Sequence, residues 1–326
     1  MRHPLTILPS AMALALLTAC AAAPTSAENG GNGSGSGKSS SIQRQIGVMG
    51  TGLEVEVHAP TRHQALLASE AAIQAVELAE QRLSTWTADS DLSAVNRGGK
   101  ASELLAAELE LAVAWSRRTE GAFQPKAGAL IQAWDLRGQG RVPSPAECSA
   151  AAADHSLWEE GGFGKGAALD QAILKLHNSA VTQAVLNLGG QIAVLDGTAT
   201  TIEISHPLQR QQVVARFDID SGSVATSGNS ERGLLVDGQA VGHLLDPRSG
   251  RPAADFGSVT VWAPSAFAAD CLSTALFVMG PDAAMSWAKQ NPDVEVLILL
   301  ANPKGLQWRM TPGMERRLQV LASTES

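Results

Sequence analysis

Apolar and polar positions change their spacing several times along the chain, and these changes predict a mixture of strands and helices. Residues 53–58 alternate between apolar and polar positions, as a half-buried strand does. Residues 63–83 and 102–118 instead repeat their apolar positions every three or four residues, which predicts two helices, the second capped by Ser102. The same spacing predicts a third helix at residues 166–177.

The rest of the chain is dominated by short apolar runs that predict strands. Two further helices are predicted there, a buried one at residues 267–279 and another at residues 283–290. Because the strands arrive in runs and the helices are grouped apart from them, the order favours an α+β fold over a regular βαβ alternation. The length suits one large domain or two interlocked halves. The predicted strands cover residues 184–188, 192–195, 201–204, 213–219, 258–263, 294–300 and 306–310.

The N-terminus has the pattern of a secretion signal. Arg2 and His3 precede an apolar run at residues 5–19, which is too short and too weakly flanked to span a membrane. The run ends in Leu17-Thr-Ala-Cys20, which resembles the lipobox of bacterial lipoproteins and implies cleavage before Cys20 and acylation of its thiol. The alternative is an ordinary secretory signal that is cut near Ala27.

The segment after the signal is rich in Gly, Ser, Ala and Asn, a composition that buries little surface and favours a flexible tether. We therefore expect a signal peptide at residues 1–19, an acylated cysteine and linker at residues 20–41, and the functional domain at residues 42–326. This order predicts a lipid-anchored protein on the periplasmic face of a bacterial membrane.

Charge and cysteine content narrow the partners. The chain has 24 Lys and Arg against 32 Asp and Glu, a net charge of −8, which argues against nucleic acid because phosphate backbones require basic surfaces. Besides Cys20, only Cys148 and Cys271 are present. An oxidising compartment would permit a disulfide between them, but two cysteines provide no framework and Cys271 lies inside a polar motif, so we expect both to be free.

Three small polar clusters interrupt the apolar runs of residues 222–280. They are Ser223-Val-Ala-Thr-Ser-Gly228, Gly242-His-Leu-Leu-Asp-Pro-Arg-Ser-Gly250 and Ala269-Asp-Cys-Leu-Ser-Thr274. Core packing does not require imidazole, carboxylate, guanidinium and hydroxyl groups within so short a span. The pattern is typical of a site carried on loops by a rigid scaffold, and its groups suit phosphate and a hard metal ion.

Two of these clusters suggest specific chemistry, each with a plainer alternative. Asp270 and Thr274 are four positions apart on a predicted helix, so they share a face and offer hard oxygen ligands of the kind that hold Mg²⁺. A helix cap or a salt link is the alternative. His243 is a natural proton carrier near neutral pH, and Arg248 is suited either to hold a phosphate or to pair with Asp246. A polar turn is the alternative there.

Two glycine-rich segments carry weaker signals. Glu160-Gly-Gly-Phe-Gly-Lys-Gly166 lets backbone N–H groups approach a ligand at the start of a helix, but it matches neither the Walker A nor the dinucleotide pattern. Asn187-Leu-Gly-Gly190 follows an apolar strand, and its glycines favour a tight structural hairpin over ligation.

Together and in this order, the motifs resemble those of the FAD:protein FMN transferases, the ApbE-type flavin transferases once described as thiamine-biosynthesis lipoproteins. The resemblance runs from about Met49 to Gly280, and its most specific parts are the three polar clusters. The other matching segments are Met49-Gly-Thr51, Leu83-Ser-Thr-Trp86 with Asp89-Ser and Asn96, Gly121-Ala-Phe-Gln-Pro125, the loop around Lys165, and Asn187-Leu-Gly-Gly190.

The resemblance implies an ApbE-like, T-fold-like α+β domain of two interlocked halves, with mixed or antiparallel sheets, grouped helices and a flavin bound between the halves. It also implies that FAD and Mg²⁺ are reactants. FMN would move from FAD to a threonine hydroxyl on a target flavoprotein, and AMP would leave. The implied targets are subunits of membrane redox complexes or related flavoproteins that face the periplasm.

The same resemblance implies roles for single residues. Asp270 and Thr274 are the implied metal ligands, with the carbonyl of Gly162 as a third. His243 is the implied acceptor of the threonine proton, oriented by Asp246. Trp86 is suited to stack on a ring of FAD. The residues implied to line the FAD site are Met49, Trp86, Ala122, Phe123, Gln124, Glu159 and Lys165.

Several positions depart from the family pattern without touching the metal pair or the His-x-x-Asp motif. They remove one carboxylate that would face FAD and alter the mouth of the site. Two other functions stay open: a flavin-binding lipoprotein without transfer activity, and a metal-dependent FAD pyrophosphatase that yields free FMN and AMP. The departures are Trp86 for Tyr, Gln124 for Asp, Lys126 for a small residue, Glu159-Glu160 for Asp-Leu, and Ser230 where Tyr is frequent.

Overall fold

The computed structural model describes residues 39–195, 197, 199–229, 234–236, 239–302 and 305–321. The predicted signal peptide, Cys20, most of the predicted linker and Ser230 lie outside these residues. Regular structure begins at Ser40, slightly inside the predicted linker. Within the described part of the chain, no helix combines the length and apolarity needed to cross a membrane.

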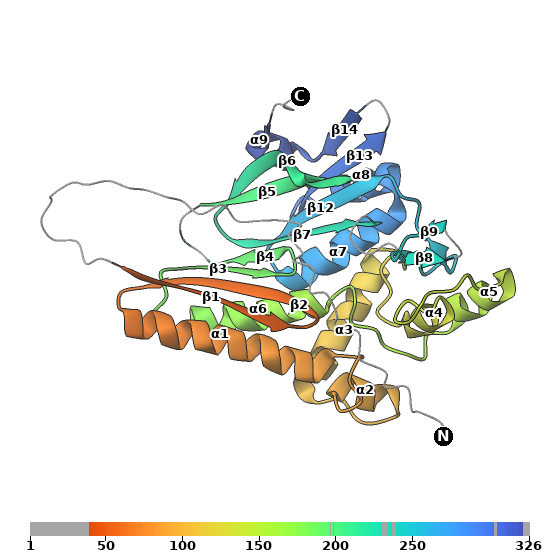
Figure 1. Cartoon of the computed structure of the whole chain (residues 1–326), viewed down its shortest axis with the longest axis horizontal. Helices are drawn as coiled ribbons and strands as arrows, with labels where there is room; N and C mark the ends of the chain where they lie inside the picture. The colour runs from red at the N-terminus through yellow and green to blue at the C-terminus, as the bar shows by residue number, and fades with distance from the viewer. Residues whose placement is uncertain are drawn as a thin grey trace, which may run out of the picture.

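An antiparallel sheet of eight strands forms the centre of the molecule (Figure 1). Every pairing between its neighbouring strands is antiparallel, which decides between the mixed and antiparallel sheets expected from the sequence. In spatial order the strands are β1 (Ser40–Val48), β2 (Thr51–Ala59), β3 (Gln183–Leu188), β4 (Gln191–Val194), β7 (Gly222–Gly228), β12 (Gly257–Ala263), β13 (Glu295–Asn302) and β14 (Gly305–Met310).

Long helices cover one face of this sheet. Alternation along β2 turns Leu53, Val55 and Val57 inward, where they pack with the alanine-rich side of the first helix. The first and second of these helices pack on each other, as do the second and third. The four helices are α1 (Arg62–Leu83), α6 (Gly164–His177), α7 (Ala266–Met279) and α8 (Pro281–Gln290).

A smaller sheet covers part of the opposite face (Figure 1). Its strands are β5 (Thr200–His206), β6 (Gln209–Ile219) and β15 (Gln319–Val320), in the order β15-β6-β5. Ile204 and Phe217 of the small sheet pack with Ile192 and Val224 of the large one in a separate apolar cluster. The central strands are therefore buried on both sides. A short helix, α9 (Pro312–Arg317), precedes β15.

The large sheet consists of two units with the same order of elements. The first runs β1-β2-α1-α6-β3-β4 and the second runs β7-β12-α7-α8-β13-β14. In both units the strands lie in the sheet in chain order, and the pairing of β4 with β7 joins the units edge to edge. These units are the two interlocked halves that the sequence analysis expected.

Each unit carries one long insertion, and the two insertions meet. Trp134 donates a hydrogen bond of 2.8 Å from its indole nitrogen to the carbonyl of Gly250. A Cβ on Gly250 would lie 2.4 Å from the carbonyl oxygen of Cys148, so a side chain there would prevent this approach. The first insertion holds α2 (Asp91–Asn96), α3 (Glu103–Arg118), α4 (Gly128–Ala133) and α5 (Pro145–Ala153). The second holds β8 (Leu234–Val236), β9 (Gln239–Val241), β10 (Leu245–Asp246) and β11 (Arg251–Pro252).

Several local expectations are confirmed. Ser102 caps α3, and its hydroxyl accepts a hydrogen bond from the backbone N–H of Leu105. Gly189 and Gly190 both have positive φ, and they make the tight turn of the β3–β4 hairpin. Cys148 and Cys271 are free and buried.

Reciprocal capping ties helices α6 and α7 together across the two units. The carboxylate of Asp170 on α6 accepts hydrogen bonds from the first two backbone N–H groups of α7, at Ala266 (2.7 Å) and Phe267 (3.0 Å). The carboxylate of Asp270 on α7 accepts one of 3.0 Å from the backbone N–H of Gly166, in the first turn of α6. These N–H donors have no partner within their own helices, so a carboxylate of each helix caps the N-terminus of the other.

Replacing Asp170 should therefore destabilise the whole domain. The Asp170→Ala variant leaves two buried N–H groups without acceptors, and we expect it to lower the free energy of unfolding by about 2 kcal/mol. Urea denaturation followed by circular dichroism measures the change. Asp293→Ala, at an exposed position, is the matched control and should stay within about 0.5 kcal/mol of the wild type. Equal stabilities for the two variants would contradict the capping role.

Candidate active site

Two segments that carry predicted site residues meet where the loop before α6 crosses α7. Asp270 and Thr274 lie four residues apart on α7, as predicted. A Cβ built on Gly162 would lie 3.5 Å from the hydroxyl oxygen of Thr274 and 3.1 Å from the ring of Phe123. The loop therefore rests directly on α7, and a glycine allows this close approach.

The carboxylate of Asp270 already has a cationic neighbour. Asp270 is only 3% exposed, and the ammonium nitrogen of Lys165 lies 3.2 Å from one of its oxygens. Its other oxygen caps α6. The salt link and the helix cap that the sequence analysis kept as alternatives for Asp270 are thus both present.

The same group of oxygens suits a hard cation. Among the described residues, no three His, Cys, Asp or Glu side chains are arranged to hold a metal ion. A site here would instead combine the carboxylate of Asp270, the hydroxyl of Thr274 and the backbone carbonyl of Gly162. One carboxylate with neutral oxygens is the kind of incomplete shell that Mg²⁺ accepts when substrate phosphates supply the remaining ligands. The buried carboxylate holding an ammonium group shows that this position takes a positive charge.

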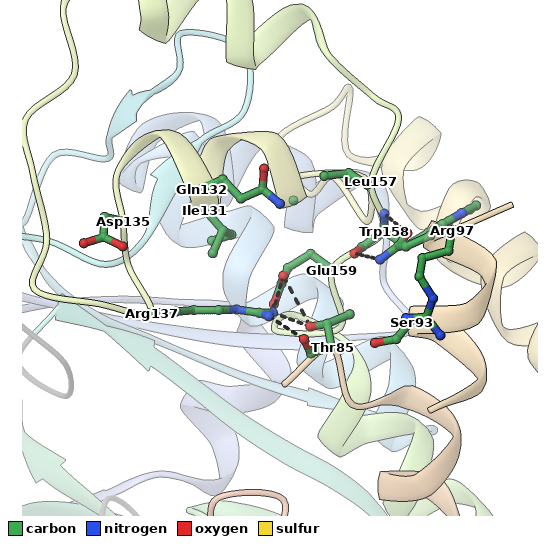
Figure 2. A pocket seen from close by; sticks show the side chains of 12 residues that line it. Thr85, Ser93, Arg97, Ile131, Gln132, Asp135, Arg137, Leu157, Trp158 and Glu159 are labelled. Atoms are coloured by element: carbon green, nitrogen blue, oxygen red, sulfur yellow. Dashed lines mark hydrogen bonds and ion pairs between the residues drawn. The ribbon is translucent and has the colours of Figure 1, made fainter. Parts of the chain in front are cut away.

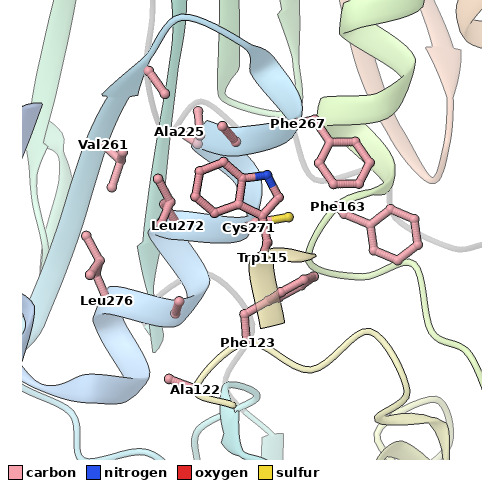
Figure 3. Packing of buried hydrophobic residues seen from close by; sticks show 14 of the residues in the cluster. Trp115, Ala122, Phe123, Phe163, Ala225, Val261, Phe267, Cys271, Leu272 and Leu276 are labelled. Carbon is pink, nitrogen blue, oxygen red and sulfur yellow. The ribbon is translucent and has the colours of Figure 1, made fainter. Parts of the chain in front are cut away.

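Buried aromatic side chains pack around Phe163, at the end of the loop before α6 (Figure 3). The ring of Phe163 lies 5.5 Å from that of Phe267 and 6.5 Å from that of Phe123, measured between ring centres. Ala122 and Phe123 are 1% and 3% exposed, so their side chains belong to the core. Their expected contacts with FAD stay a prediction, and burial of the side chains leaves mainly backbone atoms to make them.

Met49 and Gln124 are both held by hydrogen bonds that involve backbone N–H groups. Met49 occupies the β1–β2 turn with a positive φ of 52°, and its backbone N–H donates to the carboxylate of Glu80 at 2.8 Å. Its terminal methyl group would lie 3.6 Å from a Cβ at Gly164, which places Met49 beside the start of α6. The side-chain oxygen of Gln124 accepts a hydrogen bond of 3.1 Å from the backbone N–H of Lys126. Their contacts with FAD also stay predictions.

A cluster of charged residues borders a cavity of about 360 Å³ next to the loop before α6 (Figure 2). Arg137 donates to both oxygens of Glu159, at 2.7 and 2.5 Å, and Thr85 donates to the carboxylate of Glu160. The guanidinium carbon of Arg137 lies 4.7 Å from the ring centre of Trp86. Arg137 went unnoticed in the sequence because its partners lie 22 and 52 residues away.

Glu159 has an unusual proton affinity for a carboxyl group. Burial raises its pKa to about 7, and repulsion from the neighbouring Glu160 carboxylate adds to the effect. The hydrogen bonds and the positive charge of Arg137 act in the opposite direction and lower this pKa. Glu159 therefore changes charge near neutral pH, as functional carboxyl groups often do.

The His243 motif lies on the second insertion, close to the glycine turn of the first. Arg248 donates to Asp246 from its backbone N–H (2.9 Å) and from its guanidinium (2.9 and 3.1 Å), which confirms the pairing considered from sequence. A Cβ on Gly121 would lie 3.9 Å from the side chain of Arg248. This contact joins the His243 motif to the segment that carries Phe123. The orientation of His243 by Asp246 stays a prediction.

Most of the residues expected to form one site are linked by direct contacts. Phe123, Gly162 and Thr274 touch at one point, and Lys165 and Met49 adjoin it through Asp270 and the start of α6. Glu160 adjoins this group, because a Cβ on Gly164 would lie 3.1 Å from its side chain. Glu159 is its neighbour in the chain. Arg137 extends the group along the cavity, and Trp86 adjoins Arg137.

Comparisons with known proteins agree on one family. A sequence model of the ApbE family matches residues 49–298. The FAD:protein FMN transferase of Treponema pallidum is 28% identical to this chain and covers 84% of it, matching 88% of its own length. The FAD:protein FMN transferase of Salmonella typhimurium is 26% identical over 71% of this chain and 76% of its own.

Solved structures share the fold. The ApbE protein of Thermotoga maritima has a TM-score of 0.77 at 25% identity and covers 85% of this chain and 99% of its own. The flavinyl transferase ApbE of Pseudomonas stutzeri in its apo form has a TM-score of 0.74 at 23% identity, with coverages of 86% and 97%. Because the family match spans most of the domain and includes every part of the described site, the chain belongs to the ApbE family.

Proposed function

We propose that this enzyme is an FAD:protein FMN transferase that uses Mg²⁺, moves FMN from FAD to a threonine hydroxyl of a target flavoprotein, and releases AMP. The observation that carries the proposal is the meeting of Gly162, Asp270 and Thr274 beside Lys165. The family membership and the names of the curated relatives support the transfer of FMN.

The proposed reaction replaces the phosphoanhydride bond of FAD with a phosphate ester bond to threonine. The bond between the FMN phosphorus and the oxygen shared with AMP breaks, and a bond forms between that phosphorus and the threonine oxygen. AMP leaves with the electron pair of the broken bond. The threonine proton must be removed as the new bond forms, and the imidazole of His243 is the group on the second insertion suited to accept it.

The residues at the start of α6 and on α7 would hold the metal and the diphosphate. Asp270, Thr274 and the carbonyl of Gly162 would bind Mg²⁺, which supplies neutralisation of the diphosphate and of the leaving AMP. Lys165 is 3.2 Å from Asp270 and is long enough to turn its ammonium group to a phosphate oxygen. On the flavin side, Trp86 offers a flat ring for stacking.

Anchoring would place the reaction at a membrane surface. Lipid on Cys20, followed by the linker, would hold the domain on the periplasmic side. An acceptor threonine on a membrane redox subunit or a related flavoprotein facing the same side would then be within reach. Free FMN as the product would instead indicate a pyrophosphatase, and no product would indicate a flavin-binding protein.

Transfer should require a divalent cation. With FAD, Mg²⁺ and an acceptor flavoprotein, we expect flavin fluorescence on the acceptor band of a denaturing gel, and none with excess EDTA or with the acceptor threonine changed to valine. Thr274→Val should weaken Mg²⁺ binding, measured by calorimetry, by about tenfold or more. Thr274 is a cleaner target than Asp270, whose carboxylate also caps α6.

The control for Thr274→Val is Thr201→Val on β5, in the small sheet, which should bind Mg²⁺ as the wild type does. Undiminished transfer in excess chelator would overturn the metal assignment. Normal Mg²⁺ affinity in Thr274→Val would remove that hydroxyl from the metal shell.

His243→Ala should slow transfer far more than it weakens FAD binding, because a general base acts in the transition state. We expect single-turnover transfer at saturating FAD to fall by roughly a hundred- to ten-thousand-fold. Titration of FAD should give a dissociation constant close to that of the wild type. His206→Ala, at the end of β5 in the small sheet, is the matched control. Normal transfer at saturating FAD would exclude His243 as the base and leave Asp246 as the next residue to test.

Membrane attachment should depend on Cys20. In a bacterial host the wild-type protein should fractionate with membranes, and Cys20→Ser should be soluble or remain unprocessed. Cys148→Ser also removes a thiol but keeps the lipobox, so it should fractionate as the wild type does. Release of the wild-type protein after cleavage near Ala27 would contradict the lipid anchor.

A further inference from the structure

The side chain of Arg137 joins three loops at the edge of the cavity (Figure 2). One guanidinium nitrogen donates to the backbone carbonyl of Thr85 at 2.7 Å, and the other donates to the hydroxyl of Thr85 and to both oxygens of Glu159. The guanidinium carbon lies over the ring of Trp86, 4.7 Å from the ring centre. One side chain thereby connects the loop after α1, the loop after α4 and the loop before α6.

A compact turn presents Arg137 in this position. Asp135, with a positive φ of 49°, ends α4, and its backbone carbonyl accepts hydrogen bonds from Gly138 (3.0 Å) and Gly140 (3.2 Å). Its carboxylate accepts a third from the backbone N–H of Gln139 at 3.1 Å. At the base of the turn, Trp134 is bonded to the second insertion. The turn is therefore held both by its own hydrogen bonds and by the bond to the second insertion, which limits the positions that Arg137 can take.

Arg137 is also the positive charge between two neighbouring carboxylates. Its guanidinium lies 2.5 Å from an oxygen of Glu159 and 3.8 Å from one of Glu160, and both carboxylates are largely buried. Two adjacent buried carboxylates without a cation would be strongly unfavourable. A lysine could supply the charge, but its ammonium group is a single point donor. It cannot donate to the Thr85 carbonyl and to Glu159 from two separate nitrogens while also lying over the ring of Trp86.

Trp86 is the residue that this arrangement controls. Its side chain is 65% exposed, and an exposed tryptophan without a neighbour samples several rotamers. Cation–π contact with Arg137 covers one face of the ring and disfavours the other rotamers. The opposite face is left for a flat ligand.

We propose that Arg137 is a positioning residue that fixes Trp86 as a one-sided stacking platform for a planar heteroaromatic ring of the substrate, beside the cavity bordered by Thr85 and Glu159. The identity of that ring as part of FAD rests on the proposed function. The fixing of Trp86 does not, because the contacts that produce it exist without a ligand.

Two substitutions separate geometry from charge. Arg137→Lys keeps the positive charge between the carboxylates but loses the second donor nitrogen, which bonds the Thr85 carbonyl, and the guanidinium over Trp86, and Arg137→Leu loses all three. Arg141→Leu is the matched control, because Arg141 lies four residues further along, is exposed and pairs with Glu147 away from Trp86. The full-length protein is labelled with 5-fluorotryptophan, and Trp86→Phe identifies the ¹⁹F resonance of Trp86.

We expect the Trp86 resonance of the ligand-free protein to shift and narrow in both Arg137 variants, as the ring is released, and to stay unchanged in Arg141→Leu. Fluorescence titration should give FAD dissociation constants raised about tenfold or more in both Arg137 variants. The melting temperature should fall in Arg137→Leu and recover in Arg137→Lys, because lysine restores the charge without the geometry.

A wild-type Trp86 resonance and FAD affinity in Arg137→Lys would overturn the proposal, since charge alone would then suffice. A lower melting temperature in Arg137→Leu with unchanged FAD affinity and resonance would reduce Arg137 to a structural role and would also overturn it. Failure of the wild-type protein to bind FAD would reject the proposed function instead. The Trp86 resonance, measured without ligand, would still decide whether Arg137 positions the ring.

Discussion

The exchange of carboxylate caps between α6 and α7 is the constraint on which the rest of the structure depends. Within the sheet the two units are joined by the pairing of β4 with β7, and their helices are joined separately. Asp170 and Asp270 join them by satisfying helix-start N–H groups that have no other partner. The close approach requires Gly166, where a Cβ would lie 2.4 Å from the carbonyl oxygen of Ala266. The relative position of the units is thereby set at the point where the site is built.

The site follows from this connection because each unit places its insertion on the same side of the paired helices. The first insertion brings Phe123 under Gly162, and the second brings Arg248 against Gly121. The hydrogen bond from Trp134 to Gly250 then closes the insertions on each other. Rigid helices carry Asp270 and Thr274, and loops carry the groups around them. This division suits the proposed transfer, in which the diphosphate of bound FAD must be held in place while the acceptor enters and leaves.

Much of the fold could be predicted from spacing alone, because the buried strands and amphipathic helices repeat apolar residues at their own periods. The strand β7 was missed for a physical reason: its Ser223 and Thr226 look like loop residues, but they bond to Ile192 and Thr260 on the neighbouring strands. Such pairing depends on tertiary structure. Within the site, the i, i+4 spacing of Asp270 and Thr274 predicted that they share one face of a helix. That Gly162 lies next to Thr274 was implied only by the family resemblance. The contacts of Arg137 with Thr85 and Glu159 could not be predicted, because they join residues that are far apart in the chain.

Under the proposed function, Asp270 would link stability and function in a single carboxylate. One of its oxygens accepts a hydrogen bond from the backbone N–H of Gly166, and the other accepts one from the ammonium group of Lys165. A dication would attract that second oxygen more strongly than an ammonium group does. Lys165 would then be released from Asp270, and the helix cap would stay in place. The released ammonium would then lie next to the position where phosphates complete the metal shell. The same contact that stabilises the buried carboxylate before binding would thus supply a phosphate-binding group afterwards, with no rearrangement of α6 or α7.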